Sequence, residues 1–187
     1  MLDRGAIFAA MVGLGMAVTI AISFALVIAI QPLVFISAPL AGATIGWYAN
    51  HKSFRWRPRW RLFSNAAFAG AVTGLSLALF YVGIRLLFIY ADSGYRPEPM
   101  GGQFECSNGP ECTYVRLIEE PDNAQALLDE GITDVDTYTA FVWRTSGEWT
   151  LQLTGLTLIG GLLPAAWRAW KPSPSDEEIE AAIAAAQ

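Results

Sequence analysis

The distribution of apolar residues divides the chain into four long hydrophobic segments separated by polar ones. The segments are residues 6–30, 33–48, 64–90 and 150–166. The first holds 25 residues without a charge, about 37 Å of α-helix, which exceeds a hydrocarbon core of about 30 Å. The pattern therefore predicts an all-α integral membrane protein with four transmembrane helices, the last continuing to residue 170.

The first two segments predict a tight helical hairpin, because Gln31 and Pro32 interrupt an otherwise continuous apolar stretch. A cleaved signal peptide is the alternative for the first segment, since Arg4 precedes its apolar run, but that run is longer than a signal sequence needs. Pro39 lies inside the second segment, where its missing backbone donor predicts a kink or a locally unwound turn.

Composition and charge add an orientation to this pattern. With 53% hydrophobic and only 16% charged residues, the chain is too apolar to bury itself in one small soluble core. Residues 50–63 carry five basic and no acidic residues, whereas residues 91–149 carry twelve acidic residues against three arginines, a net charge of −9. Lys and Arg are concentrated in cytoplasmic loops. We therefore expect a multi-pass protein of the cell membrane with residues 50–63 and both termini cytoplasmic, and residues 91–149 forming an acidic extracytoplasmic cap.

The basic loop mixes arginines with tryptophans in a segment too short to leave the membrane surface. We expect its rings to lie at headgroup level and its charges to meet anionic lipid phosphates. The residues expected there are Lys52, Arg55, Trp56, Arg57, Arg59, Trp60 and Arg61. An acidic groove on a cytoplasmic partner is an alternative. Stacking on single-stranded nucleic acid is disfavoured by the position of the loop between two spans, so no nucleic acid partner is expected.

Arg85 is the one charged residue inside a predicted span, five residues before Tyr90. Charged residues at membrane depth are functional candidates and usually have a partner. The other three spans contain no acidic residue, histidine or lysine. We therefore expect Arg85 to extend to the outer interface and to meet a lipid phosphate or a loop carboxylate such as Asp92 or Glu148. A role inside the membrane is the alternative.

Small residues recur at every fourth position in the first three spans. Such stripes let helices approach closely, which is how membrane helices associate when burial in lipid gives no advantage. The alternative is that alanine-rich helices produce these spacings by chance. The residues expected at helix contacts include Gly13, Ala17, Gly42, Gly46, Gly70 and Gly74.

The cap contains both cysteines, Cys106 and Cys112, separated by a turn sequence that includes Asn108 and Gly109. Two thiols across a turn on an oxidising face predict a disulfide. Zinc is the weaker alternative, because the spacing is not that of a zinc motif and no second ligand pair lies nearby.

The rest of the cap and the C-terminal tail predict short elements. Residues 113–118 alternate like a strand, residues 121–128 form a helix that Gly131 ends, and Thr133 caps a second helix over residues 134–144. The cap is thus expected to be α-helical with some β-structure. Beyond the fourth span, Ser175 and Glu178 predict a capping box for a short acidic helix over residues 176–186.

Function is constrained mainly by what the sequence lacks. It has no nucleophile paired with a base, no phosphate-binding glycine loop and no metal-ligand cluster, so neither enzyme activity nor a cofactor is expected. The favoured hypothesis is an accessory or scaffolding subunit of a larger membrane assembly, bound to other membrane proteins or to itself. One alternative is an envelope sensor. The other is a small transporter or channel whose polar path would be lined by Pro39, Thr73, Ser76, Arg85, Gln152 and Thr157.

Overall fold

The structure, a computed structural model, describes residues 2–27, 31–51, 58–170 and 184, and these ranges contain helices but no strand. The elements are α1 (Arg4–Ile22), a π-helical turn η1 (Ser23–Val27), α2 (Gln31–His51), α3 (Arg59–Tyr90), a 3₁₀ turn η2 (Glu98–Met100), α4 (Pro110–Ile118), α5 (Pro121–Asp129) and α6 (Val135–Trp170). The first, second, third and sixth helices are long and apolar enough to cross a membrane. The predicted all-α fold with four such helices is therefore confirmed.

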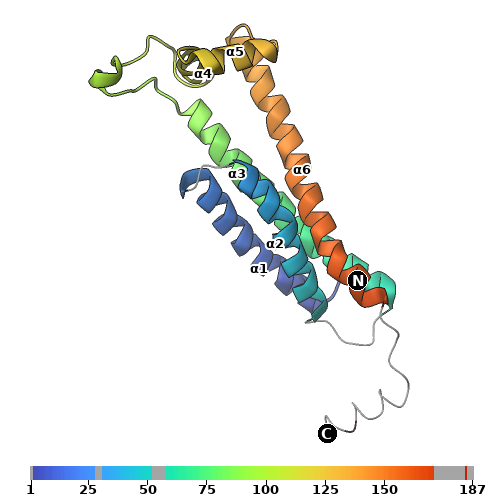
Figure 1. The fold of residues 1–187 in the computed structure, drawn as a ribbon. Helices are drawn as coiled ribbons and strands as arrows, with labels where there is room; N and C mark the ends of the chain where they lie inside the picture. Colours follow the sequence, from blue (N-terminus) through green and yellow to red (C-terminus); the bar gives the residue numbers. More distant parts are fainter. Residues whose placement is uncertain (1, 28–30, 52–57, 171–183, 185–187) are drawn as a thin grey trace.

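The four long helices lie side by side, with α1 and α6 each packed against both α2 and α3 (Figure 1). The N-terminus, the start of α3 and the end of α6 lie at one end of the bundle. At the other end, α3 and α6 continue beyond α1 and α2, and α4 and α5 lie across their tips (Figure 1). This difference in length follows from the residue counts, because α3 has 32 residues and α6 has 36, against 21 in α2.

The sixth helix corrects the prediction for the C-terminal half of the chain. The expected separate helix over residues 134–144 and the span from residue 150 are one continuous helix. No proline interrupts the polar stretch between them, and Gly147 alone does not end a helix. The N-cap is Asp134 rather than Thr133, since the Asp134 carboxylate accepts a hydrogen bond from the backbone N–H of Thr137 at 2.8 Å.

The strand predicted over residues 113–118 is wrong, because these residues belong to α4. Pro110 at the first helical position starts the helix. Tyr114 and Leu117, three residues apart, then pack from one face of α4 against a cluster that includes Tyr138. Burial of this face outweighs the β-propensity of the segment, and the described residues of the cap contain helices and loops but no strand.

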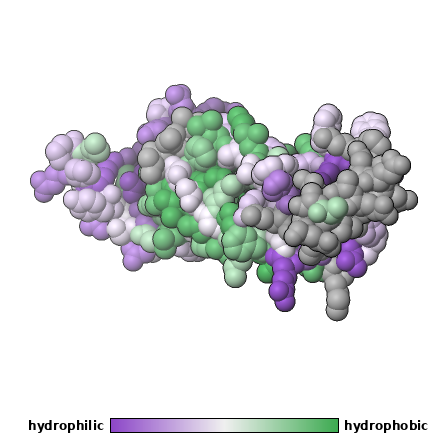
Figure 2. Space-filling view, turned by 90° about the horizontal axis from the view of Figure 1, so that it is seen from below, coloured by the Kyte–Doolittle hydropathy of each residue, from purple (hydrophilic) through white to green (hydrophobic). Residues whose placement is uncertain are grey.

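Small side chains dominate the bundle interior. Ala17, Ala38 and Ala78 are fully buried beside Leu77 and Leu153 in the largest cluster. The helices can therefore approach closely, while large apolar side chains point outward along the spans. Figure 2, a view from below, shows hydrophobic residues gathered in the middle of the molecule and hydrophilic ones mainly toward its sides.

Several predictions fall on residues outside the described ranges. They concern Lys52, Arg55, Trp56 and Arg57 of the basic loop, and the capping box and acidic helix of the C-terminal tail.

Candidate functional site

The predicted contact glycines lie where helix backbones meet. A methyl group added at Gly42 would overlap the carbonyl oxygen of Thr157, and one at Gly46 would overlap that of Gly161. At Gly13 it would overlap the Thr73 hydroxyl. These glycines therefore contact other helices of the same chain, which leaves little of the small-residue stripes exposed for contact with a partner.

The remaining predicted contact residues are also in the interior. A methyl group at Gly74 would lie 2.9 Å from the Thr154 Cα, whereas one at Gly70 would lie at an ordinary 3.4 Å from the Thr157 carbonyl oxygen. Ala17 is fully buried in the largest cluster.

The residues suggested for a polar path do not line one hydrated channel in the described part of the chain. Thr73 and Thr157 are fully buried, and each hydroxyl donates a hydrogen bond to a carbonyl of its own helix. Gln152 is exposed on the outer surface of α6. The Pro39 carbonyl lies where a side chain on Gly160 would be, so this turn of α2 packs directly against α6. Within the described residues, these side chains therefore do not converge on one path.

The basic end of the bundle is closed by hydrogen bonds. Arg168 donates to the Asn50 carbonyl oxygen at the end of α2, at 2.8 Å. Asn65 donates to the Asp3 carboxylate at 2.7 Å, which ties the N-terminal segment to α3. The described members of the predicted lipid interface, Arg59, Trp60 and Arg61, begin α3 at this end.

Arg85 is held by hydroxyl groups rather than by a carboxylate. Its guanidinium donates to Thr145 Oγ1 at 3.1 Å and to Ser146 Oγ at 3.4 Å, and it lies 4.2 Å from the ring centre of Trp149. Both hydroxyls donate to carbonyls of α6, so their oxygens are free to accept from Arg85. Arg85 therefore joins α3 to α6 by two hydrogen bonds and a cation–π contact.

The two carboxylates proposed as partners of Arg85 pair with other arginines. Asp92 binds Arg116 at 2.8 Å, and Glu148 lies 4.0 Å from Arg144. In the described residues Arg85 has no ion pair with an acidic side chain. A lipid phosphate remains an available partner from the sequence-based prediction.

Helix lengths and charges locate the hydrocarbon edge along the bundle. A core of about 30 Å takes about 20 residues of helix. Counted from Trp167, that length ends near Glu148, whose charged side chain is 56% exposed. Counted from Leu62, it ends near Val82 on α3. Arg85, just beyond Val82, donates to Thr145, just before Glu148 in the sequence. The two counts therefore end at the same level of the bundle. Placed by these two counts, a core of about 30 Å ends before residues 83–90 of α3 and 135–147 of α6, which we term the stalk.

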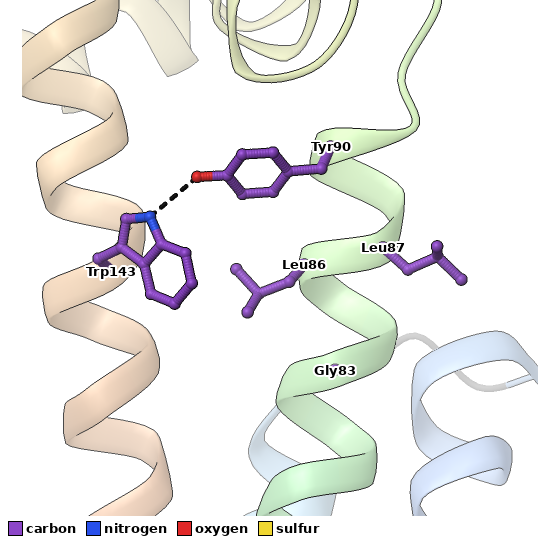
Figure 3. Close-up of a pocket in the computed structure, with 5 residues that line it drawn as sticks. All are labelled: Gly83, Leu86, Leu87, Tyr90 and Trp143. Carbon is purple, nitrogen blue, oxygen red and sulfur yellow. Dashed lines mark hydrogen bonds between the residues drawn. The ribbon is translucent and has the colours of Figure 1, made fainter.

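An apolar groove opens between the two helices of the stalk (Figure 3). It encloses about 380 Å³, and we term it the stalk groove. Tyr90 reaches across from α3 and accepts a hydrogen bond from Trp143 Nε1 at 2.8 Å, while Leu86 points toward α6 below this bridge (Figure 3). The residues that line it are Gly83, Leu86, Leu87, Tyr90 and Trp143.

The sequence did not indicate the stalk groove, because it assigned all apolar residues up to Tyr90 to the third span. The available signal was Glu148 with Arg144, since charges at these positions limit how far the hydrocarbon reaches along α6. That limit applies to the neighbouring turn of α3 as well.

The cap contains the predicted disulfide between Cys106 and Cys112, whose Cα atoms are 5.3 Å apart. Cys112 is fully buried. Gly94 packs on the bond, because a methyl group there would lie 2.7 Å from the Cys106 sulfur, and its φ of +68° also favours glycine. The disulfide therefore fixes the loop before η2 as well as the start of α4.

Two arginines and Asp92 organise the irregular part of the cap. Arg96 lies 4.1 Å from the ring centre of Phe104 and pairs with Glu119. Asp92 accepts hydrogen bonds from the Gly94 backbone and from Arg116. Among the residues that the structure describes, no three His, Cys, Asp or Glu side chains gather to bind a metal.

No protein-family model, no curated protein and no solved structure matches this chain. The argument for function therefore depends on the geometry of the chain itself.

Proposed function

We propose that this protein is a non-enzymatic multi-pass membrane protein that acts as an accessory or scaffolding subunit of a larger membrane assembly. The observation that carries the proposal is the stalk. Two helices extend beyond the hydrocarbon, leave an apolar groove uncovered and hold a disulfide-linked helical cap across their tips. This arrangement offers a surface to another protein, whereas the bundle interior is closed by backbone contacts.

The proposed orientation has the basic end in the cytoplasm and the cap outside. Its support is the charge distribution, because described arginines at positions 4, 59, 61 and 168 lie at one end and the cap carries a net charge of −9 at the other. A disulfide in the cap agrees with an oxidising compartment. Both termini would then be cytoplasmic.

The test is the native mass of the protein extracted with its own membrane lipids into a nanodisc or mild detergent. The 20.3 kDa chain should be found in a complex with another membrane protein. A particle that contains one copy of the chain and only lipid would contradict the proposed function.

A further inference from the structure

The stalk exposes large apolar side chains where bilayer hydrocarbon does not cover them. Leu87 is 65% exposed, Phe88 61% and Trp143 57%. Similar side chains along the spans face acyl chains, but the stalk begins where charged Glu148 marks the hydrocarbon edge. A contiguous apolar surface outside the hydrocarbon marks a site of interaction.

The shape of the stalk groove suits a protruding side chain from a partner. At Gly83 a methyl group would meet nothing within 4 Å, so the lower part of the groove is open. The hydrogen bond between Tyr90 and Trp143 bridges the groove above and fixes both rings (Figure 3). A leucine or phenylalanine could therefore enter the groove beside Gly83, below two aromatic rings that are already positioned.

Charge around the groove defines the flanks of that partner. Asp136 precedes Trp143 by seven residues and so lies on the same face of α6. It is exposed and makes no ion pair within the described ranges. The three arginines of the cap already have acidic partners, which are Glu119 for Arg96, Asp92 for Arg116 and Glu130 for Arg144. Arg85 at the base of the stalk is held by Thr145 and Ser146, while the cap above the groove, to which Asp136 belongs, carries a net charge of −9. A segment complementary to this end of the groove is therefore basic.

A second copy of this chain is a poor occupant by the same reasoning. Docking stalk against stalk would bring together two caps that each carry a net charge of −9. Like charges brought together at an interface oppose association. The electrostatics thus favour a different protein over self-association.

We propose that the stalk groove is the docking site for a segment of a partner membrane protein that is apolar at its centre and flanked by lysine or arginine. This inference rests on the proposed function and names the surface and the chemistry of the partner. Apolar contact supplies the affinity, and the acidic surroundings select a basic segment.

The experiment uses the full chain in nanodiscs of zwitterionic lipid and a short amphipathic peptide with leucines on one face and lysines on the other. The lysine peptide should bind more strongly to discs that contain the protein than to empty discs. The same peptide with glutamates in place of lysines should show no such difference. Leu87→Ser should weaken binding about tenfold, and Asp136→Asn about threefold. Leu128→Ser is the matched control, because Leu128 is 55% exposed on α5 away from the groove, and it should leave affinity unchanged.

Three results would overturn the inference: no binding in excess of empty discs, equal binding of both peptides, or affinity that Leu87→Ser does not change. Native mass separates this failure from failure of the proposed function. A complex that persists in the Leu87→Ser variant leaves the function standing and removes the groove from it. A complex with another protein that is lost with Leu87→Ser and kept with Leu128→Ser supports the inference. If the complex that Leu87→Ser abolishes contains only copies of this chain, the proposal of a basic partner protein is wrong.

Discussion

At the scale of single residues, polar side chains connect elements that apolar packing leaves apart. Arg85 joins the two helices at the base of the stalk, and Asp92 holds the first turn of the cap. These contacts were not predictable from the sequence, because an arginine can bind a hydroxyl, a carboxylate or a phosphate. The sequence indicated only that Arg85 needed a partner.

Replacing Arg85 by Ala should lower the free energy of unfolding by about 1–3 kcal/mol, since it removes two hydrogen bonds and the contact with Trp149. The matched control is Arg144→Ala, whose ion pair with Glu130 is 3.6 Å long and exposed and should contribute less than about 1 kcal/mol. Thermal unfolding in detergent, followed by tryptophan fluorescence, measures both. Equal losses would show that Arg85 acts only as a surface charge.

Two exposed carboxylates make local cap structure sensitive to acid. Hydrogen bonds from Ser107 lower the pKa of Glu111, and the backbone N–H of Thr137 lowers the pKa of Asp134. A lowered pKa in the folded state means that the stabilisation is complete above the ordinary values of 4.5 and 3.8 and is lost as pH falls below them. The protection of the Ser107 and Thr137 amides, measured relative to the intrinsic exchange rate at each pH, should therefore fall under acid conditions.

The controls for that measurement are Glu111→Gln and Asp134→Asn. Each variant should exchange faster at neutral pH and show a weaker dependence on acid at its own amide. An unchanged pH profile in both variants would mean that other groups cause the acid sensitivity.

At the scale of helices, apolar length predicted the four spans, but context decided where the elements begin and end. Residues 113–118 favour a strand by local propensity, but Pro110 starts a helix before them, and Tyr114 and Leu117 pack from that helix against the stalk. The polar residues around Arg144 suggested a break in α6. Arg144 instead pairs with Glu148 one turn further along α6 and with Glu130 in the loop after α5, and the helix continues through this stretch.

Replacing Gly42 by Ala should destabilise the bundle by about 1–3 kcal/mol, because the added methyl group meets the Thr157 backbone and forces α2 away from α6. Gly155→Ala is the matched control within a helix. A methyl group at Gly155 meets nothing within 4 Å, so this change should be neutral or stabilise by about 0.5–1 kcal/mol. Thermal unfolding of the two variants tests the assignment, and the reverse order would refute it.

Replacing Cys106 and Cys112 together by Ser should loosen the cap and leave the bundle folded. The closed loop is short, with a sequence separation of 6, so the chain-entropy model gives less than the roughly 3 kcal/mol of a 15-residue loop. Hydrogen exchange should increase over residues 92–112 and stay unchanged in α2 and α3. Increased exchange throughout the bundle would show that the disulfide supports more than the cap.

At the scale of the whole molecule, the sequence predicted four spans and a separation of charge between the ends. It did not predict that two helices outreach the other two, because an apolar run cannot distinguish lipid from an uncovered protein surface. By sequence, Leu86 and Leu87 are typical membrane residues, whereas in the structure they line a groove with Trp143, the residue before Arg144 on α6. The stalk groove depends on how α3 and α6 lie against each other, which the sequence alone does not specify.

The orientation predicts which end an impermeant thiol reagent reaches in intact cells. In a background without the native cysteines, Tyr95→Cys in the cap should be labelled from outside and Trp60→Cys at the basic end should not. Both positions are suitable, since Tyr95 is 71% and Trp60 56% exposed. Labelling of Trp60→Cys alone would invert the topology.

The unequal helix lengths make the stalk sensitive to the thickness of the bilayer. The α1–α2 pair matches a core of about 30 Å, but α3 and α6 remain helical beyond it, and α3 is apolar there apart from Arg85. A bilayer about 5 Å thicker reaches one more helical turn, from Gly83 to Leu87, and its acyl chains would then compete for the lower half of the groove. Lipid composition alone would thus regulate how much of the groove is available to a protein.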